Sequence, residues 1–120
     1  MTKKSDWQII DMPQQTNTFF IERSFTPNEM NLIMQGHKPR AMEDKWFLYF
    51  EDNKLYCHRS WTGYCIYIVD FSENEKINVI VNRNLEQHSK INLFTDREMV
   101  IYLIESLLCQ KTEQSVDKEK

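Results

Sequence analysis

His58, Arg59 and Ser60 form a polar triplet within the most aromatic part of the chain, and they are the residues best suited to chemistry. An imidazole exchanges protons near neutral pH, and a guanidinium binds carboxylate or phosphate groups. Trp61 follows directly and offers a flat ring to a planar ligand. The triplet therefore predicts a site for an anionic ligand, or an acid–base site in which His58 is the candidate catalytic residue.

The rest of the sequence holds no motif of an established enzyme class. Glycine-rich phosphate loops, HExxH zinc motifs and GxSxG nucleophile motifs are absent from this chain, which has two glycines. The histidines and cysteines also lack the spacing of metal ligands. We therefore expect no metal and no cofactor, and the sequence leaves open whether the protein is an enzyme.

Composition and charge restrict the class of protein. A chain of 120 residues suits one domain, and its hydrophobic content of 41% supports an ordinary core. The net charge of -3 provides no extended nucleic-acid surface. No apolar run approaches the roughly 20 residues that span a bilayer, and we expect no signal peptide. Three cysteines, an odd number, favour a reduced protein, so we expect a cytoplasmic location without membrane contact.

The triplet belongs to a predicted three-stranded antiparallel meander, Trp46–Phe71. The dipeptides Asp52–Asn53 and Thr62–Gly63 are typical of tight turns, and they divide the run into segments of strand length. A fourth strand is predicted at Lys76–Asn82, because its β-branched residues suit a buried position in a sheet. Two further short strands are expected, Trp7–Met12 and Phe19–Ser24.

Two helices are predicted from their starting signals. Thr26–Glu29 combines a capping box with a proline at the first helical position, so a short helix is expected over 27–35. A second capping box at Thr95–Glu98 predicts a longer helix over 96–110.

These elements predict a single α+β domain over residues 1–110. Its antiparallel sheet has four to six strands, with the central meander over 46–82, and the short and the C-terminal helix pack on it. The remaining residues, 111–120, lack apolar periodicity and are expected to form a flexible tail.

Two-residue turns would fix the register of the meander and so assign its side chains to faces. In that register His58 lies opposite Tyr67. His58 and Ser60 then share one face, while Arg59 and Trp61 point to the other. A site that uses all four requires the end of the sheet near the second turn, where both faces are accessible.

The polar segment before the meander, 37–45, contributes basic side chains and is either a solvated loop or a loop that contacts phosphate. Arg59 must lie at the end of the sheet, reach an anionic ligand, or pair with a carboxylate, for which Asp44 and Glu43 are near in sequence. Trp61 is either a core residue or a stacking residue. The predicted ligand-binding residues are His58, Arg59, Ser60, Trp61, Tyr67, Arg40 and Lys45.

The sequence around the triplet resembles the core of a small, uncharacterised bacterial protein family. The motifs are W-F-x-Y-x-E at Trp46–Glu51, L-x-x-H-R-S-W-T-G at Leu55–Gly63 and C-I-Y at Cys65–Tyr67. Members of this family sometimes accompany macrodomains or other ADP-ribosyl-related domains, which implies nucleotide or ADP-ribose biology. The resemblance covers residues 25–72 and implies no established activity.

Three functions are consistent with these residues. The first is a small binding module in which His58, Arg59, Ser60 and Trp61, with the basic side chains of the preceding loop, hold a nucleotide-like or ADP-ribose-like anionic ligand. The second is a hydrolase or transferase with His58 as general acid or base. The third is a protein-interaction or inhibitor domain that uses an aromatic sheet face with Tyr49, Tyr56 and Tyr67. The expected partner is a small anionic ligand, and a protein partner is the alternative.

Overall fold

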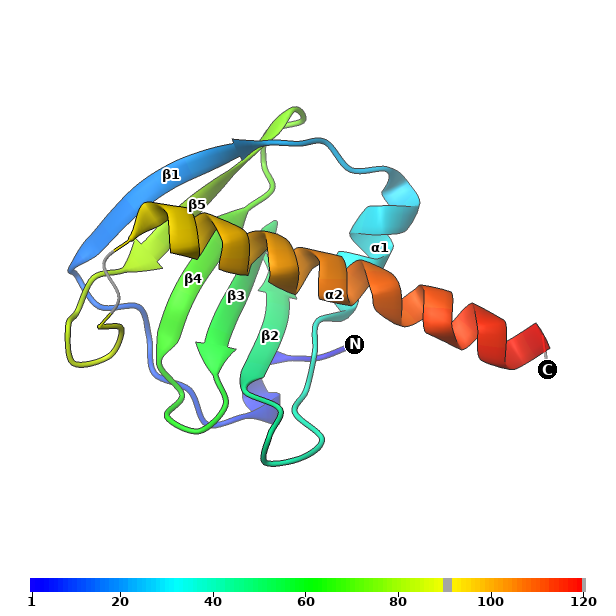
Figure 1. Ribbon diagram of the computed structural model, residues 1–120, viewed down its shortest axis with the longest axis horizontal. Helices are drawn as coiled ribbons and strands as arrows, with labels where there is room; N and C mark the ends of the chain where they lie inside the picture. Colours follow the sequence, from blue (N-terminus) through cyan, green and yellow to red (C-terminus); the bar gives the residue numbers. More distant parts are fainter. Residues whose placement is uncertain (90–91, 120) are drawn as a thin grey trace.

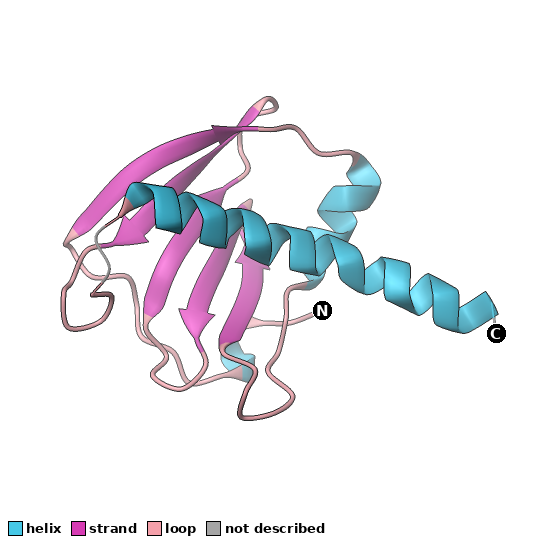
Figure 2. Ribbon diagram, viewed as in Figure 1, coloured by secondary structure: helices cyan, strands magenta, loops and turns pink. Residues whose placement is uncertain are grey.

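The computed structural model describes residues 1–89 and 92–119, the last ten of them by their backbone alone. Five antiparallel strands form one sheet in the order β1-β5-β4-β3-β2, and two helices complete the fold (Figure 1, Figure 2). The predicted α+β class is confirmed. The elements are a short 3-10 helix (Lys4–Asp6), β1 (Thr16–Glu22), α1 (Pro27–Gln35), β2 (Trp46–Glu51), β3 (Lys54–Arg59), β4 (Cys65–Asp70), β5 (Lys76–Asn82) and α2 (Leu93–Glu119).

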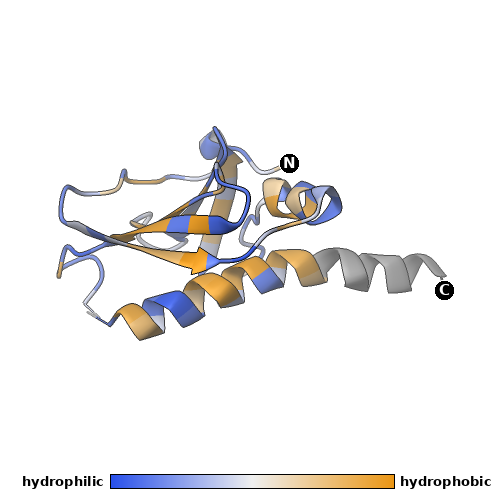
Figure 3. Cartoon of the chain, turned by 90° about the horizontal axis from the view of Figure 1, so that it is seen from above, coloured by the Kyte–Doolittle hydropathy of each residue, from blue (hydrophilic) through white to orange (hydrophobic). Residues whose placement is uncertain are grey.

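The two faces of the sheet have different covers. α2 crosses one face, with α1 packed against it, and the N-terminal segment, residues 1–12, lies on the other side (Figure 1, Figure 3). Buried side chains of α2, among them Leu103 and Leu107, pack on the strands and form the main core. On the second face Trp7 stacks on Phe47, with ring centroids 5.9 Å apart. The N-terminal segment therefore acts as the cover of β2 and β3.

α1 has the predicted bounds because its capping box forms. The hydroxyl of Thr26 accepts the N–H of Glu29 at 3.1 Å, and the Glu29 carboxylate accepts the N–H of Thr26 at 2.9 Å. Gly36 ends the helix with a φ of +68°, and a β-carbon there would collide with the carbonyl oxygen of Leu48. This close approach lets the N–H of His37 donate to Leu48 O at 2.8 Å, which covers the edge of β2.

The first hairpin of the meander, β2 with β3, has the predicted register. Tyr49 lies opposite Tyr56, and their rings stack with centroids 4.7 Å apart. Asp52 and Asn53 have φ values of 54° and 64°, the left-handed geometry that a type I′ turn requires. Both residue types tolerate this geometry, so the local sequence selects the turn and with it the register.

The second hairpin, β3 with β4, differs from the prediction. The N–H of Arg59 donates to Tyr64 O at 2.9 Å and the N–H of Gly63 donates to Arg59 O at 2.8 Å, so residues 60–63 connect the strands. The predicted two-residue turn is therefore wrong. Gly63 has a φ of +80°, and a β-carbon there would lie 2.7 Å from the carbonyl oxygen of Gln8. The N-terminal segment packs directly on this turn, and that contact is invisible in the local sequence.

A β-bulge then shifts the register of β4. Cys57 lies opposite Tyr67, whereas His58 lies opposite Cys65, so Ile66 is an extra residue in β4. The predicted pairing of His58 with Tyr67 is wrong. Because one inserted residue reverses the alternation of a strand, the bulge places Tyr67 in the core between the sheet and α2.

The N-terminal third of the chain also departs from the prediction. Trp7–Met12 is not a strand. Its one strand-like backbone pairing is an isolated β-bridge between Ile10 and Tyr64. β1 begins at Thr16, earlier than the predicted strand at Phe19–Ser24, because its first residues already pair with β5.

α2 begins earlier than predicted and continues further. The side-chain oxygen of Asn92 accepts the N–H of Phe94 at 2.9 Å, which is the capping role that the sequence assigned to Thr95. The helical backbone reaches Glu119. The predicted flexible tail, 111–120, lies where no side chain is described, and its flexibility stays a prediction. Within the described part of the chain, no helix is both long and apolar enough to cross a membrane.

Candidate functional site

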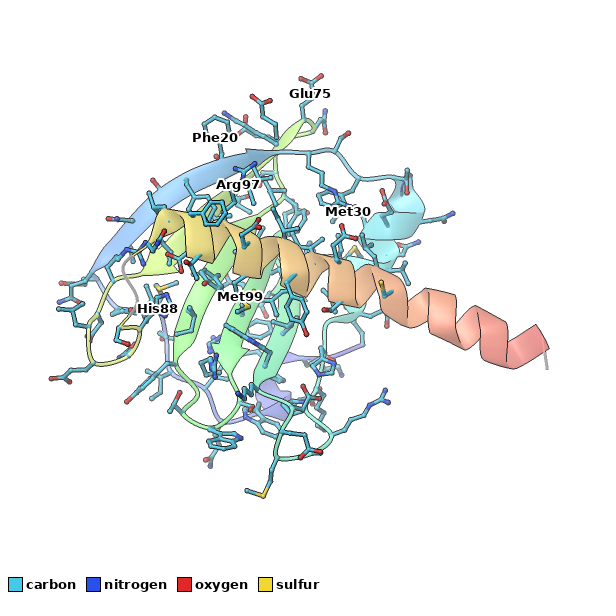
Figure 4. All side chains as sticks on the ribbon, viewed as in Figure 1. Phe20, Met30, Glu75, His88, Arg97 and Met99 are labelled. Atoms are coloured by element: carbon cyan, nitrogen blue, oxygen red, sulfur yellow. The ribbon has the colours of Figure 1, made fainter. Side chains whose placement is uncertain are left out.

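A pocket of about 570 Å³ lies at the end of the sheet where β3 ends and where β2 and β4 begin. The loop that follows β5 and the first turns of α2 form its other side. Figure 4 labels two of the lining residues, His88 just before α2 and Met99 within it, which lie along the lower side of the helix in this view. Four predicted ligand-binding residues also line the pocket, Lys45, Arg59, Trp61 and Tyr67.

Arg59 lies over an aromatic ring, and no carboxylate in the described part of the chain pairs with it. Its guanidinium carbon is 4.9 Å from the centroid of the Trp46 ring, the geometry of a cation–π contact. The carboxylate of Asp44, a partner expected from the sequence, binds Nε2 of His37 at 2.7 Å. Across residues 1–89 and 92–109, no carboxylate forms an ion pair with Arg59. Its positive charge is therefore available to a ligand.

Trp61 is a surface residue, with 71% of it exposed, so the expectation of a core tryptophan is wrong. Its indole N–H donates to the carbonyl oxygen of Met42 at 2.7 Å, which holds the ring against the preceding loop. Because the hydrogen bond uses one edge of the ring, a planar ligand can stack on an exposed face. Trp61 therefore forms an aromatic rim of the pocket.

A buried carboxylate, Asp96, lies beneath the pocket and was not identified from the sequence. Its Oδ1 accepts the hydroxyl of Tyr67 at 2.8 Å and Nε2 of His88 at 2.9 Å. Its Oδ2 accepts Nη2 of Arg83 at 2.7 Å. Burial raises the pKa of Asp96, but the hydrogen bonds from His88, Arg83 and Tyr67 outweigh burial and hold the pKa below its ordinary value. The carboxylate is therefore ionised at neutral pH.

No local motif connects the members of this cluster, because they come from β4, the loop after β5 and the start of α2. The one signal in the sequence was an acidic residue in the first turn of the predicted helix. An acid there is usually explained by the helix dipole. Tyr67 was predicted as a site residue, but on the face of the sheet that carries His58. Burial raises the pKa of its hydroxyl, so the hydroxyl remains a hydrogen-bond donor.

His58, the candidate catalytic residue, lies on the opposite face of the sheet and is 1% exposed. Its Nδ1 is 2.9 Å from the carbonyl oxygen of Gly63, and its ring stacks on Tyr49 with centroids 5.7 Å apart. Burial lowers the pKa of His58, so the imidazole is neutral and donates from Nδ1. Nε2 is buried without a hydrogen-bond partner among the described residues. The structure therefore does not bring His58 to the pocket.

Ser60 and Arg40 also lie outside the pocket. The hydroxyl of Ser60 donates to the backbone carbonyl of Asp44 at 2.8 Å. Arg40 and Ser60 both line a separate pocket of about 480 Å³, which shares Trp61 with the first and is completed by Trp7 and the loop before β2. The polar triplet is therefore divided among three environments, and Arg59 is its member in the main pocket.

Metal-ligating residues do not gather in the described part of the chain. No group of three histidine, cysteine, aspartate or glutamate side chains there is placed to hold a metal ion. The three cysteines are unpaired, with Cys57 and Cys65 buried and Cys109 exposed.

The fold and the pocket define a class, an α+β protein with a ligand-sized pocket at one end of an antiparallel sheet. No family model, curated protein or solved structure matches the chain. A fold of this class hosts many functions, so the function is argued from the site.

Proposed function

We propose that this protein is a small binding module and that the pocket beside Arg59 holds a planar anionic ligand of the nucleotide or ADP-ribose type. The observation that carries the proposal is the unpaired guanidinium of Arg59, which lies over Trp46 at the wall of the pocket. A guanidinium that lies over a ring can still donate its N–H groups to a ligand, and these match the oxygens of phosphate or carboxylate.

The charges around the pocket favour an anion. Lys45 and Arg59 both line it, whereas the negative charge of Asp96 is already compensated by Arg83. Glu86 also lines the pocket, so the described lining residues leave two cations against one uncompensated carboxylate. Phosphate has the geometry and charge to use both cations together.

The size and the aromatic rim favour a ligand with a ring. The pocket volume of about 570 Å³ falls in the range of roughly 300–1,000 Å³ found for small-molecule sites. Trp61 supplies an exposed ring at the rim, and Met99 and Ile66 supply apolar surface inside. A ring stacked on Trp61 with its phosphate toward Arg59 would use all of these groups.

The two alternatives receive less support from the geometry. A hydrolase or transferase based on His58 needs that residue at a substrate, and His58 is enclosed on the other face. An interaction domain based on the aromatic face needs exposed tyrosines, and Tyr49 and Tyr67 are both buried. The free thiols fit the reducing cytoplasm that we propose as the location of the protein.

The test is calorimetric titration with ADP-ribose, AMP and inorganic phosphate. Arg59→Gln removes the charge and keeps a side chain of similar length, and we expect it to weaken binding of ADP-ribose or AMP about 10- to 100-fold, the usual effect of one charged hydrogen bond. Arg97→Gln is the matched control, since Arg97 is exposed and donates to the backbone carbonyl of Phe20 outside the pocket. Absence of binding across the panel, or equal affinity in Arg59→Gln, would overturn the proposal.

A further inference from the structure

His88 lines the pocket, and one of its two ring nitrogens is held by Asp96. Nε2 of His88 lies 2.9 Å from Oδ1 of Asp96, and the His88 ring meets the edge of Tyr67 at 77°, with centroids 6.0 Å apart. These contacts orient the imidazole from two sides. His88 lines the pocket, and its side chain is 18% exposed, so the ring is held yet accessible.

The state of Asp96 decides which nitrogen of His88 carries the hydrogen. An ionised carboxylate accepts hydrogen bonds and donates none. Arg83 and the hydroxyl of Tyr67 donate to the same carboxylate at 2.7 and 2.8 Å, which favours the ionised form. Nε2 of His88 must therefore be the N–H donor. In the neutral imidazole Nδ1 is then an acceptor, and it has no hydrogen-bond partner among the described residues.

We propose that His88 determines the specificity of the pocket by accepting a hydrogen bond at Nδ1 from the ligand. This inference rests on the proposed binding function and deepens it by naming the ligand class. The preferred ligand is a nucleotide whose planar ring carries an N–H donor, as in uracil or guanine. A nucleotide whose ring lacks this N–H hydrogen would cover Nδ1 of His88 and leave that nitrogen without a hydrogen-bond partner.

The energetic basis is the asymmetry of buried hydrogen bonds. A polar atom that loses water on ligand binding and gains no partner costs affinity, whereas a satisfied pair contributes modestly. A fixed acceptor therefore discriminates mainly by penalising ligands that lack the donor. Because Nδ1 is only partly enclosed in the free protein, we expect about a tenfold preference in place of the larger ratios of fully enclosed sites.

The test compares two ligand pairs by titration calorimetry at pH 8. UMP is compared with N3-methyl-UMP, and GMP with N1-methyl-GMP. We expect each parent nucleotide to bind about tenfold tighter than its methylated analogue. In His88→Phe, which keeps a ring and removes both nitrogens, the ratio should fall to near one. A ratio that persists in His88→Phe reflects the bulk of the methyl group and overturns the inference.

Two further outcomes separate this inference from the function on which it rests. If all four nucleotides bind with equal affinity to the native protein, the binding function stands and the role of His88 falls. If none of the four binds, the role of His88 falls, and the titrations with ADP-ribose, AMP and phosphate decide the binding function. Imidazole nitrogen chemical shifts of the native protein provide a measurement that does not depend on a folded variant: a hydrogen on Nδ1 at pH 8 in place of Nε2 overturns the inference, and a hydrogen on Nε2 supports it.

Discussion

Replacing Asp96 by alanine should destabilise the fold more than any exposed substitution on α2. Asp96 is buried and is the counter-charge of Arg83, whose side chain is 9% exposed, and it also accepts the hydroxyl of buried Tyr67. Without Asp96 the guanidinium remains inside the protein with its charge uncompensated. Removing one partner of a buried ion pair costs about 3 to 5 kcal/mol, against a total stability of about 5 to 15 kcal/mol for a typical domain.

The measurement is urea unfolding followed by circular dichroism at pH 7. With a denaturant slope of about 1.5 kcal/mol per M, the loss lowers the unfolding midpoint by about 2 to 3 M urea. Glu98→Ala is the matched control, since Glu98 is exposed on the same part of α2 and should change stability by no more than about 0.5 kcal/mol.

A double variant tests the physical reason for the loss. Asp96→Ala combined with Arg83→Met removes both charges, and it should be more stable than Asp96→Ala alone because no buried charge is left without a partner. A loss below about 1 kcal/mol in Asp96→Ala, or a double variant less stable than the single one, would refute the assignment of a buried, coupled ion pair.

Two more predictions concern the face of the sheet opposite α2. Burial lowers the pKa of His58 below its ordinary 6.5, so the unfolded chain takes up this proton at a higher pH than the folded protein. The free energy of unfolding should therefore fall as the pH is lowered from 7 to 5, by at most about 2 kcal/mol from this residue, and urea midpoints of His58→Phe should show a flatter pH dependence. Gly63→Ala places a β-carbon against the N-terminal segment at a positive φ, and we expect a loss of about 1 to 3 kcal/mol in urea unfolding; an unchanged midpoint would contradict the described packing of this turn.

The sequence predicted the parts of the fold that local chemistry determines. The capping box at Thr26 and Glu29 and the turn at Asp52–Asn53 use contacts between residues close in sequence, so the bounds of α1 and the register of β2 with β3 were correct. The turn around Gly63 was wrong because residues 60–63 pack against the N-terminal segment, which is far away in sequence.

The pocket could be predicted only in part, because it joins residues that are distant in sequence. Arg59 and Trp61 were recognised because a guanidinium and an indole stand out within a strand pattern. The residues behind them, Asp96, Arg83 and His88, meet only when the end of β5 and the start of α2 come together. Successive residues of a strand point to opposite faces, so the sequence separated His58 from Arg59. It did not show that the N-terminal segment closes the face on which His58 lies.

The strand order also has a consequence for how the chain folds. β2 to β5 follow one another in the sheet as they do in the sequence, so they can assemble through short-range steps. β1 pairs with β5, where Thr16 meets Asn82, and it remains without a partner until that last strand exists. Among the strand pairings of the sheet, that of β1 with β5 closes the longest loop, and such steps slow folding. During synthesis β1 leaves the ribosome before the other strands of the sheet and takes its place in the sheet last.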